Sequence, residues 1–271
     1  MGQSEQAITL MGVITLAVAG WMLAAAVMAL LWAWHLRRQN AGIVDVGWTA
    51  LVAGLAILDA RLGDGWEYRR AAFGFMMGSW GLRLAVYLLY DRVLNRPEDG
   101  RYVEMRRDWG AEAPRRFFWF FQTQALAAVG FSLPALFAST NREPRFSIIE
   151  LVAAGLWVVA FAGESTADRQ LLRFKSNAAN RGRTCRTGLW KWSRHPNYFF
   201  EWLIWIAFAL FAAASPWGWI AFACPAAMLY FLLKVTGIPL NEAQALRSRG
   251  DEYREYQRST SAFVPWFPRS S

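Results

Sequence analysis

The stretch Lys191-Trp192-Ser193-Arg194-His195-Pro196-Asn197-Tyr198-Phe199-Phe200-Glu201-Trp202 gives the first clue to the fold. It brings two cations, a histidine, an amide, a phenol and a carboxylate to the start of an apolar segment, residues 203–214. Polar groups at membrane depth cost free energy unless they find partners, and they often mark functional sites. The stretch therefore predicts a site for an anionic cofactor at the point where a membrane helix begins.

The composition is typical of a membrane protein. The chain has 271 residues, of which 55% are hydrophobic and 16% aromatic. Several apolar runs reach the length of about 20 residues that a helix needs to cross a bilayer. We expect an all-α, polytopic integral membrane protein that forms a single domain over residues 1–271. No cleavable signal peptide is expected, because no basic segment precedes the first apolar run.

Seven membrane-spanning helices are predicted from the apolar runs. Pro134 is expected to kink the fourth span, and the fifth is expected to continue as helix to residue 174. Only a few residues separate the sixth span from the seventh, which predicts a tight hairpin, and Gly237-Ile238-Pro239 is expected to end the seventh. The predicted spans cover residues 8–36, 42–58, 71–90, 117–138, 148–163, 198–215 and 217–235.

The distribution of positive charge predicts the orientation in the membrane. Of the 29 Lys and Arg residues, 23 lie in segments on one side of the predicted spans and five lie in the loops on the other side. Basic residues concentrate in cytoplasmic loops, so the N-terminus is expected outside and the C-terminus in the cytoplasm. The same rule accounts for the net charge of +9 without nucleic-acid binding.

Two predicted spans carry charged side chains near a phenol. Asp45 lies early in the second span, and Arg83 lies in the third span, one helical turn before Tyr87. Residues four apart share a helix face, so Arg83 and Tyr87 can project together toward Asp45. One interpretation is a structural ion pair between Asp45 and Arg83. The other is a catalytic group in which Tyr87 donates a proton or polarises a carbonyl.

A second polar group lies around the sixth span. Glu164 and Asp168 are one turn apart at the end of the fifth span, and Asn197 and Glu201 are one turn apart at the start of the sixth. A solvated helix end would explain the first pair, and an interfacial anchor would explain the aromatic residues beside the second. Neither explanation accounts for an amide and a carboxylate that lie deeper than those aromatic residues.

Known soluble nucleotide-binding motifs are missing from the sequence. It contains neither a glycine-rich Rossmann turn after a strand nor a P-loop. Arginines suit bidentate phosphate binding, and several lie in the loop at residues 95–102 and in the segment 169–194. The two cysteines, Cys185 and Cys224, are not expected to form a disulfide, and no metal-binding pattern is present.

These motifs resemble the bacterial DUF1295 membrane proteins of the steroid 5-alpha-reductase superfamily. The resemblance covers most of the chain. Arg-His-Pro-x-Tyr also occurs in sterol C14-reductases and isoprenylcysteine carboxyl methyltransferases, whereas the Asn-Tyr-x-x-Glu-Trp continuation favours the reductases. The motifs are Val44-Asp45-Val46-Gly47-Trp48, Gly81-Leu82-Arg83-Leu84, Glu98-Asp99-Gly100-Arg101-Tyr102, Gly188-Leu189-Trp190, the stretch from Ser193 to Trp202, Asp251-Glu252-Tyr253-Arg254-Glu255-Tyr256 and Phe263-Val264-Pro265.

The resemblance implies a seven-helix membrane enzyme that uses NADPH to reduce the C=C bond of a 4-ene-3-one steroid or a similar lipid enone. Hydride goes to the beta carbon while an acidic group polarises the keto oxygen. By motif, the resemblance implies that the cofactor is bound by Asn95, Arg101, Asp168, Lys175, Arg183, Asn197 and Glu201. From the surrounding motifs we also expect cofactor contacts from Tyr102, Arg173, Arg194, His195, Tyr198 and Trp202.

The catalytic residues depart from the family pattern. The steroid enzymes use a Glu on the second helix and a Tyr on the third, and here Asp45 best matches the carboxylate. An alignment anchored on Arg83 places Trp80 at the tyrosine position, which leaves Tyr87 as the available phenol. We therefore expect Asp45, Arg83 and Tyr87 to be catalytic. The expected substrate-binding residues are Trp48 and Trp80.

Two other functions are compatible with the sequence. An S-adenosylmethionine-dependent lipid or prenyl-cysteine methyltransferase shares Arg-His-Pro-x-Tyr, a downstream acid such as Glu242 and the Tyr-x-x-Tyr tail. A non-catalytic sterol-binding or scaffold protein would leave Asp45, Arg83 and Glu201 without a task. The expected partners are membrane lipids and a steroid-like substrate that enters from the bilayer of the bacterial inner membrane. The oligomeric state stays open, and a monomer is compatible with all of these functions.

Overall fold

The computed structural model describes residues 3–94 and 97–269, with side chains from residue 14 onward, and its regular elements in these ranges are all helical. Within the described ranges, seven helical stretches are long and apolar enough to cross a membrane. By the length and composition of these helices, the predicted all-α fold with seven spans is confirmed. The protein is an integral membrane protein. The stretches are Ile14–Arg38, Ile43–Leu62, Glu67–Val93, Gly100–Ala138, Ile148–Ser176, Pro196–Ala213 and Gly218–Arg249.

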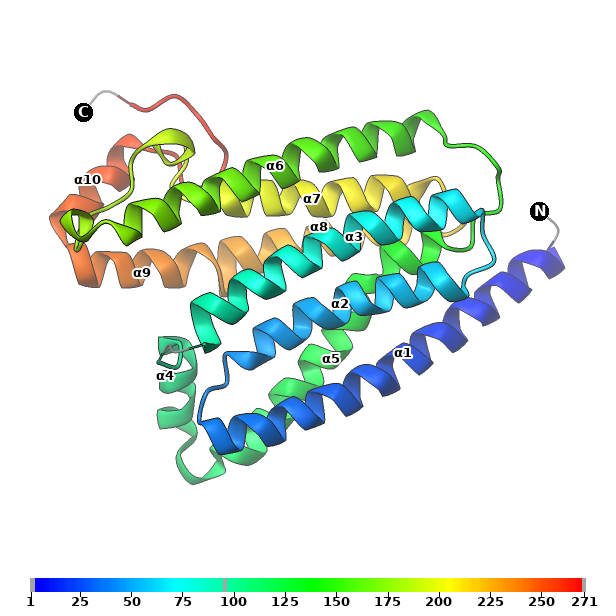
Figure 1. Cartoon of the computed structure of the whole chain (residues 1–271), viewed down its shortest axis with the longest axis horizontal. Helices are drawn as coiled ribbons and strands as arrows, with labels where there is room; N and C mark the ends of the chain where they lie inside the picture. Colours follow the sequence, from blue (N-terminus) through cyan, green and yellow to red (C-terminus); the bar gives the residue numbers. More distant parts are fainter. Residues whose placement is uncertain (1–2, 95–96, 270–271) are drawn as a thin grey trace. The chain divides into compact units, whose positions relative to one another are not determined.

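The chain divides into two compact units, which are described separately. Unit 1 comprises Met1–Phe146 and Ala212–Trp219. Its long helices are α1 (Gln3–Arg38), α2 (Ile43–Leu62), α3 (Glu67–Leu88) and α5 (Ala113–Ala138). Helix α2 contacts α1, α3 and α5, so it forms the centre of unit 1 (Figure 1). The fully buried side chains of Met28, Phe73, Met77, Phe117 and Phe121 fill its core.

Small residues let α2 and α3 approach each other closely. A Cβ atom on Gly81 of α3 would lie 2.3 Å from the Cβ of Ala53 on α2 and 3.4 Å from the carbonyl oxygen of Thr49. Such close packing between apolar helices is typical of membrane proteins, in which small residues allow backbones to approach. The α2–α3 contact therefore depends on a glycine at position 81.

Helix α3 ends in a π-helical turn, η1 (Leu89–Val93). The N–H of Leu94 donates to the carbonyl oxygen of Leu89 at 2.9 Å, a bond that spans five residues instead of four. Asp99 then caps the short helix α4 (Gly100–Trp109) by accepting a hydrogen bond from the N–H of Arg101. Figure 1 shows α4 running across the direction of the long helices of unit 1. The 3₁₀ turn η2 (Gly110–Glu112) then leads into α5.

Unit 2 comprises Ser147–Phe211 and Ile220–Ser271. It begins with α6 (Ile148–Ser176), where Ser147 and Glu150 form a reciprocal capping box. Its other α-helices are α7 (Pro196–Ala213), α8 (Ala223–Tyr230), α9 (Ile238–Arg249) and α10 (Asp251–Ser259). Short turns complete the chain: η3 (Ala178–Asn180), η4 (Gly188–Lys191), η5 (Gly218–Phe222) and a second π-helix, η6 (Phe231–Val235).

The helix boundaries follow most of the predictions made from the sequence. Helix α6 continues to Ser176, past the predicted fifth span, and α5 passes through Pro134 to Ala138. Of the predicted break at 237–239, Gly237 lies between η6 and α9, whereas Ile238 and Pro239 are the first residues of α9. In the hairpin after α7, a Cβ atom on Gly218 would lie 1.7 Å from the carbonyl oxygen of Ala212, so the turn requires glycine there. The sequence analysis did not predict α4, α9 or α10, because short polar helices lack an apolar run.

Candidate functional site

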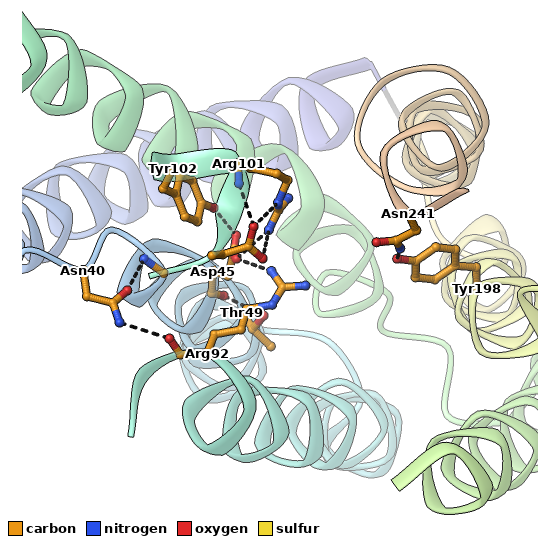
Figure 2. A network of polar contacts seen from close by, with 10 residues as sticks. Asn40, Asp45, Thr49, Arg92, Arg101, Tyr102, Tyr198 and Asn241 are labelled. Atoms are coloured by element: carbon orange, nitrogen blue, oxygen red, sulfur yellow. Dashed lines mark hydrogen bonds and ion pairs between the residues drawn. The ribbon is translucent and has the colours of Figure 1, made fainter. Parts of the chain in front are cut away.

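In unit 1, the charged residues form a group that we call the Asp45 cluster: Asp45, Arg92, Asp99, Arg101 and Tyr102 (Figure 2). Arg92 from η1 and Arg101 from α4 both form ion pairs with the Asp45 carboxylate, the second at 3.3 Å. The hydroxyl of buried Tyr102 donates to the other carboxylate oxygen at 2.8 Å. The carboxylate of Asp45 thus accepts hydrogen bonds at both oxygens and joins α2 to α4 and to the end of α3.

Backbone contacts at the end of α1 reinforce this cluster. The amide of Asn40 donates to the carbonyl oxygen of Arg92 at 3.1 Å and accepts from the N–H of Gly42 at 2.9 Å (Figure 2). The N–H of Ala41 donates to Glu98 at 2.7 Å, and Glu98 also pairs with Arg106 at 2.8 Å. The connections α1–α2 and α3–α4 are therefore bound to each other through side chains.

Asp99 supplies a second carboxylate to the Asp45 cluster. It receives hydrogen bonds from both the backbone N–H, at 3.0 Å, and the guanidinium of Arg101, at 3.1 Å. Burial opposes the charged form of Asp99, but these contacts with Arg101 outweigh it and hold the pKa of Asp99 below its ordinary value. Asp99 is therefore an ionised helix cap that also neutralises part of the charge on Arg101.

The remaining residues predicted for catalysis and substrate binding lie on α2 and α3. Arg83 and Tyr87 are partly buried and one turn apart on α3, as their spacing predicts. Trp80 is fully buried, and its ring lies 6.4 Å from that of Trp48, in an edge-to-face contact. Trp48 also contacts Phe131 at 5.4 Å, so both tryptophans pack within unit 1. Asn95, predicted to bind the cofactor, lies outside the described residues.

Unit 2 contains a second polar group, the Asn197 cluster, which consists of Glu164 and Asp168 on α6 and Asn197 and Glu201 on α7. The three acidic side chains are all buried. The Asn197 amide donates to Asp168 at 3.3 Å, and the Trp205 indole donates to Glu201 at 2.9 Å. The helices approach closely one residue before Glu164, where a Cβ on Gly163 would overlap the Phe200 ring. The structure thus brings two of the predicted residues, Asp168 and Asn197, into contact, and the third, Glu201, lies one turn further along α7.

The described residues satisfy only one end of the Asn197 amide. The side-chain oxygen of Asn197 is buried, and no donor reaches it. The amide nitrogen of Asn197 donates to Asp168, which leaves the amide oxygen on the other side. A buried acceptor without a donor costs free energy, about 1–3 kcal/mol by the usual measure. The site therefore suits a ligand that carries hydrogen-bond donors.

Just before α7, Arg194 and His195 both contact Glu242 of α9. Arg194 pairs with Glu242 of α9 at 2.7 Å and also donates to the carbonyl oxygens of Gln257 and Thr260. His195 lies 3.3 Å from the same Glu242 oxygen and stacks on Tyr198 at 5.4 Å. These contacts give Arg194 and His195 a structural task, which is to hold α9 and α10 against the start of α7. Their role toward a cofactor stays a prediction.

The connection from α6 to α7 carries the remaining cations. Arg173, Lys175 and Arg183 are exposed there, and Arg183 lines an open pocket of about 340 Å³. Arg186 and Glu252 also line this pocket, and Arg186 pairs with Glu255 at 3.5 Å. For the guanidinium of Arg183, the described residues offer no hydrogen bond or ion pair. Arg183 is thus the cation on this pocket that is best placed to receive a phosphate group.

Three side chains in and beside these clusters, Arg92, Asp99 and Asn241, were not predicted from the sequence, whereas Trp202 was. Arg92 and Asp99 were not selected, although Asp99 lies in the quoted Glu98-Asp99-Gly100-Arg101-Tyr102 motif. Asn241 donates to the hydroxyl of Tyr198 (Figure 2), and Trp202 donates to the carbonyl oxygen of Pro225 at 3.2 Å. Within the described residues, no group of three or more His, Cys, Asp or Glu side chains could hold a metal ion. Cys185 and Cys224 are both buried and form no disulfide with each other.

The apolar helices and their buried charged clusters define an all-helical integral membrane protein. The chain belongs to the family described as "Protein of unknown function (DUF1295)", which matches residues 31–260. It is similar to an uncharacterized protein of Schizosaccharomyces pombe, with 26% identity over 280 residues, covering 92% of this chain and 79% of that protein. No solved structure matches the chain at a significant level. The resemblance to DUF1295 proteins is therefore confirmed.

Proposed function

We propose that the protein is an NADPH-dependent reductase of the C=C bond of a lipid enone, of the steroid 5-alpha-reductase type. The observation that carries this proposal is the buried, unsatisfied side-chain oxygen of Asn197 beside Asp168. The carboxamide of a nicotinamide ring offers the N–H donors that such an acceptor needs, and ribose hydroxyls offer donors to carboxylates. NADPH, when bound, would supply a hydride to the beta carbon of the enone.

The residues of unit 2 divide the cofactor between two environments. Asn197, Asp168 and Glu201 offer acceptors, which suit the nicotinamide and its ribose but would repel phosphates. Arg173, Lys175 and Arg183 offer cations on the connection after α6, which suit the phosphates. Acceptors for the uncharged end and cations for the charged end are both present in one compact unit.

The proposal gives the Asp45 cluster of unit 1 a supporting task. Tyr102 is the phenol that donates to Asp45, and both oxygens of that carboxylate are engaged. Asp45 therefore fits the role of a fixed acceptor that orients a phenol better than the role of a proton donor. Tyr87 stays the predicted donor to the substrate carbonyl, with Arg83 on the same face of α3. The cofactor is expected on the cytoplasmic side, in agreement with the charge distribution.

One observation favours a second candidate, the S-adenosylmethionine-dependent methyltransferase. The buried acids Glu164, Asp168 and Glu201 would also attract the sulfonium and ammonium groups of that cofactor. The two cofactors differ in their phosphates, because S-adenosylmethionine has none. The exposed cations Arg173, Lys175 and Arg183 would then have no ligand group to bind, and for this reason we prefer the reductase.

Thermal stabilisation of the purified protein separates the two candidates. A ligand at one hundred times its Kd stabilises the folded state by about 2.7 kcal/mol. We expect NADPH to raise the midpoint of unfolding and S-adenosylmethionine to leave it unchanged. Incubation with NADPH and a panel of lipid enones, including progesterone and testosterone, should then give a product reduced at the C=C bond. Stabilisation by S-adenosylmethionine alone, or no reduced product from any enone, would remove the reductase assignment.

Substitution of Asn197 tests the observation directly. Asn197→Ala removes the acceptor proposed for the carboxamide, so the Kd for NADPH should rise about tenfold, the equivalent of about 1.4 kcal/mol. Thr166→Ala is a matched control on α6, because the Thr166 hydroxyl donates to the carbonyl of Ala162 in its own helix. Titration of both variants by intrinsic fluorescence measures the two Kd values. Equal affinity in Asn197→Ala and the wild type would contradict the proposed contact.

A further inference from the structure

The C-terminal segment after α10 exposes aromatic side chains outside any helix. Trp266 and Phe267 are 67% and 72% exposed, and Val264 is 49% exposed. Exposed apolar side chains on the membrane helices of this protein are explained by contact with lipid tails. That explanation does not extend to residues 261–269, which form no helix. Three exposed apolar side chains within four residues, at 264, 266 and 267, indicate an interaction site.

Contacts with the start of α7 fix the position of this segment. The N–H of Trp266 donates to the carbonyl oxygen of Trp192 at 2.9 Å, and the Phe267 ring lies 5.3 Å from the Trp192 ring. Phe263 is buried against Phe199 and Trp202 in the first turns of α7. Because α7 begins at Pro196 and crosses the membrane, Trp192 and its contacts lie at the depth where that membrane helix starts.

The backbone of the segment suits an environment with little water. Pro265 and Pro268 have no N–H group, and the N–H groups of Trp266 and Arg269 donate to Trp192 and Ser259. A non-helical chain near the apolar layer needs its polar groups satisfied, because few water molecules are available there. Of the seven residues from 263 to 269, two have no N–H group and two have an N–H group with a protein acceptor. These four positions need no water molecule as a hydrogen-bond partner.

Cations accompany these aromatic residues. The ammonium of Lys191 lies 5.9 Å from the centre of the Trp192 ring, and Lys191 and Arg269 are both exposed. Tryptophan beside lysine or arginine is the pattern that places a protein surface among lipid headgroups, where the rings occupy the interface and the cations meet phosphates. The charge complements anionic phospholipids.

We propose that residues 264–269, together with Lys191 and Trp192, form an interfacial anchor that lies among anionic phospholipid headgroups beside the start of α7. The segment returns the chain from the polar helix α10 to the membrane surface. Its occupant is the headgroup layer of the bilayer in which the helices lie. This inference does not depend on the proposed reductase activity.

Depth measurements on the full-length protein in nanodiscs test the proposal. Phe267→Cys carries a nitroxide label, and Arg254→Cys on the exposed face of α10 is the matched control. Both native cysteines are buried, so the unsubstituted protein serves as the labelling blank. We expect oxygen to relax the label at position 267 more strongly than a water-soluble nickel chelate does. The order should reverse at position 254. Trp266→Cys provides a second position should the first variant fold poorly.

Three outcomes decide the matter. Relaxation by oxygen at position 267 that strengthens when phosphatidylcholine is replaced by phosphatidylglycerol supports the anchor. Relaxation by the nickel chelate at both 266 and 267 would show that the segment lies in water and would overturn it. Dipolar broadening between labels in discs that hold two copies would place a second protein chain on the segment, and would also overturn it.

Discussion

The buried charged side chains of this protein have different structural roles, and their contacts identify the role of each. Arg69 of α3 is buried, and its guanidinium donates to three carbonyl oxygens of the α5–α6 connection, at 2.6 to 3.0 Å. Trp66 and Phe146 flank it. In the sequence, Arg69 is simply one of the five Lys and Arg residues in the loops on the outer side. No pattern along the chain indicates that distant carbonyl oxygens will converge on it. Asp45 was recognisable from its place in an apolar run, whereas its partner Arg92 was not.

Replacement of Arg69 by lysine should destabilise unit 1 strongly. Lysine keeps the charge but cannot reproduce the planar fork that reaches three carbonyl oxygens. Hydrogen bonds from a charged donor contribute about 1.5–3 kcal/mol each, so the loss of one or two should lower the free energy of unfolding by about 2–4 kcal/mol. Denaturation in detergent micelles provides the measurement. Arg142→Lys, at an exposed ion pair with Asp64, is the control and should change stability by less than about 1 kcal/mol.

The depressed pKa of Asp99 predicts how its contribution depends on pH. A group whose pKa is lower in the folded protein stabilises it above the unfolded pKa, and this contribution disappears as pH falls through the folded pKa. Asp99→Ala should cost about 1 kcal/mol at pH 7 through loss of the cap on α4. The difference from wild type should shrink below about pH 4, the ordinary pKa of an aspartate. Thermal melts at several pH values, with Asp99→Asn as a variant that keeps the cap without the charge, test this; a gap that stays constant down to pH 3 would contradict it.

At the scale of elements, long apolar helices were predictable and short polar ones were not. The stretches at 148–176 and 196–213 follow from hydrophobic length alone. Helix α4 has only one buried residue, Tyr102, and α10 buries Tyr253 and Tyr256 on one face. Burial raises the pKa of the Tyr253 hydroxyl to about 12, so this side chain stays a neutral phenol near pH 7. Such helices are held by specific tertiary contacts, which leave little trace in a hydropathy pattern.

The contact between α2 and α3 gives a prediction at this scale. Gly81→Ala would place a methyl group 2.3 Å from the Cβ of Ala53, and neither atom belongs to a flexible side chain. The helices must move apart, and overpacking of this kind costs about 1–3 kcal/mol. Gly54→Ala on α2 is the matched control, since nothing lies within 4 Å of its added methyl, and it should gain up to about 1 kcal/mol from helix propensity. Equal melting temperatures for the two variants would show that α3 adjusts without cost.

On the scale of the whole molecule, the chain passes between its two compact units more than once. The turn at residues 212–219 belongs to unit 1, although the helices α7 and α8 beside it lie largely in unit 2. Asn141 donates to the carbonyl oxygen of Ala214 at 2.8 Å and so holds this turn against the α5–α6 connection. The sequence predicts a single domain, because every span is apolar and none differs in composition from the others. The two units arise from the pattern of contacts between helices, and the local sequence of a helix does not indicate which other helices it will contact.

The distribution of basic residues predicts the orientation of the whole chain. With 23 of the 29 Lys and Arg residues in segments on one side, the C-terminus should face the cytoplasm and the N-terminus the opposite side. Fusions test this: a fluorescent protein after residue 271 should mature, and alkaline phosphatase fused there should be inactive. The loop at 142–145 should behave in the opposite way. Active phosphatase at the C-terminus would reverse the assignment and would place the proposed cofactor site away from cellular NADPH.

The π-helical turn at the end of α3 has a consequence for how this protein can change over time. A π turn closes its backbone hydrogen bond over five residues instead of four, so it holds one residue more than an α-helical turn. Each residue of an α-helix rotates the chain by about 100°, so the loss of one codon from 89–91 would swing Arg92 away from Asp45 without altering either residue. The pairing that joins α2 to the end of α3 therefore rests on the number of residues before it as much as on their identity.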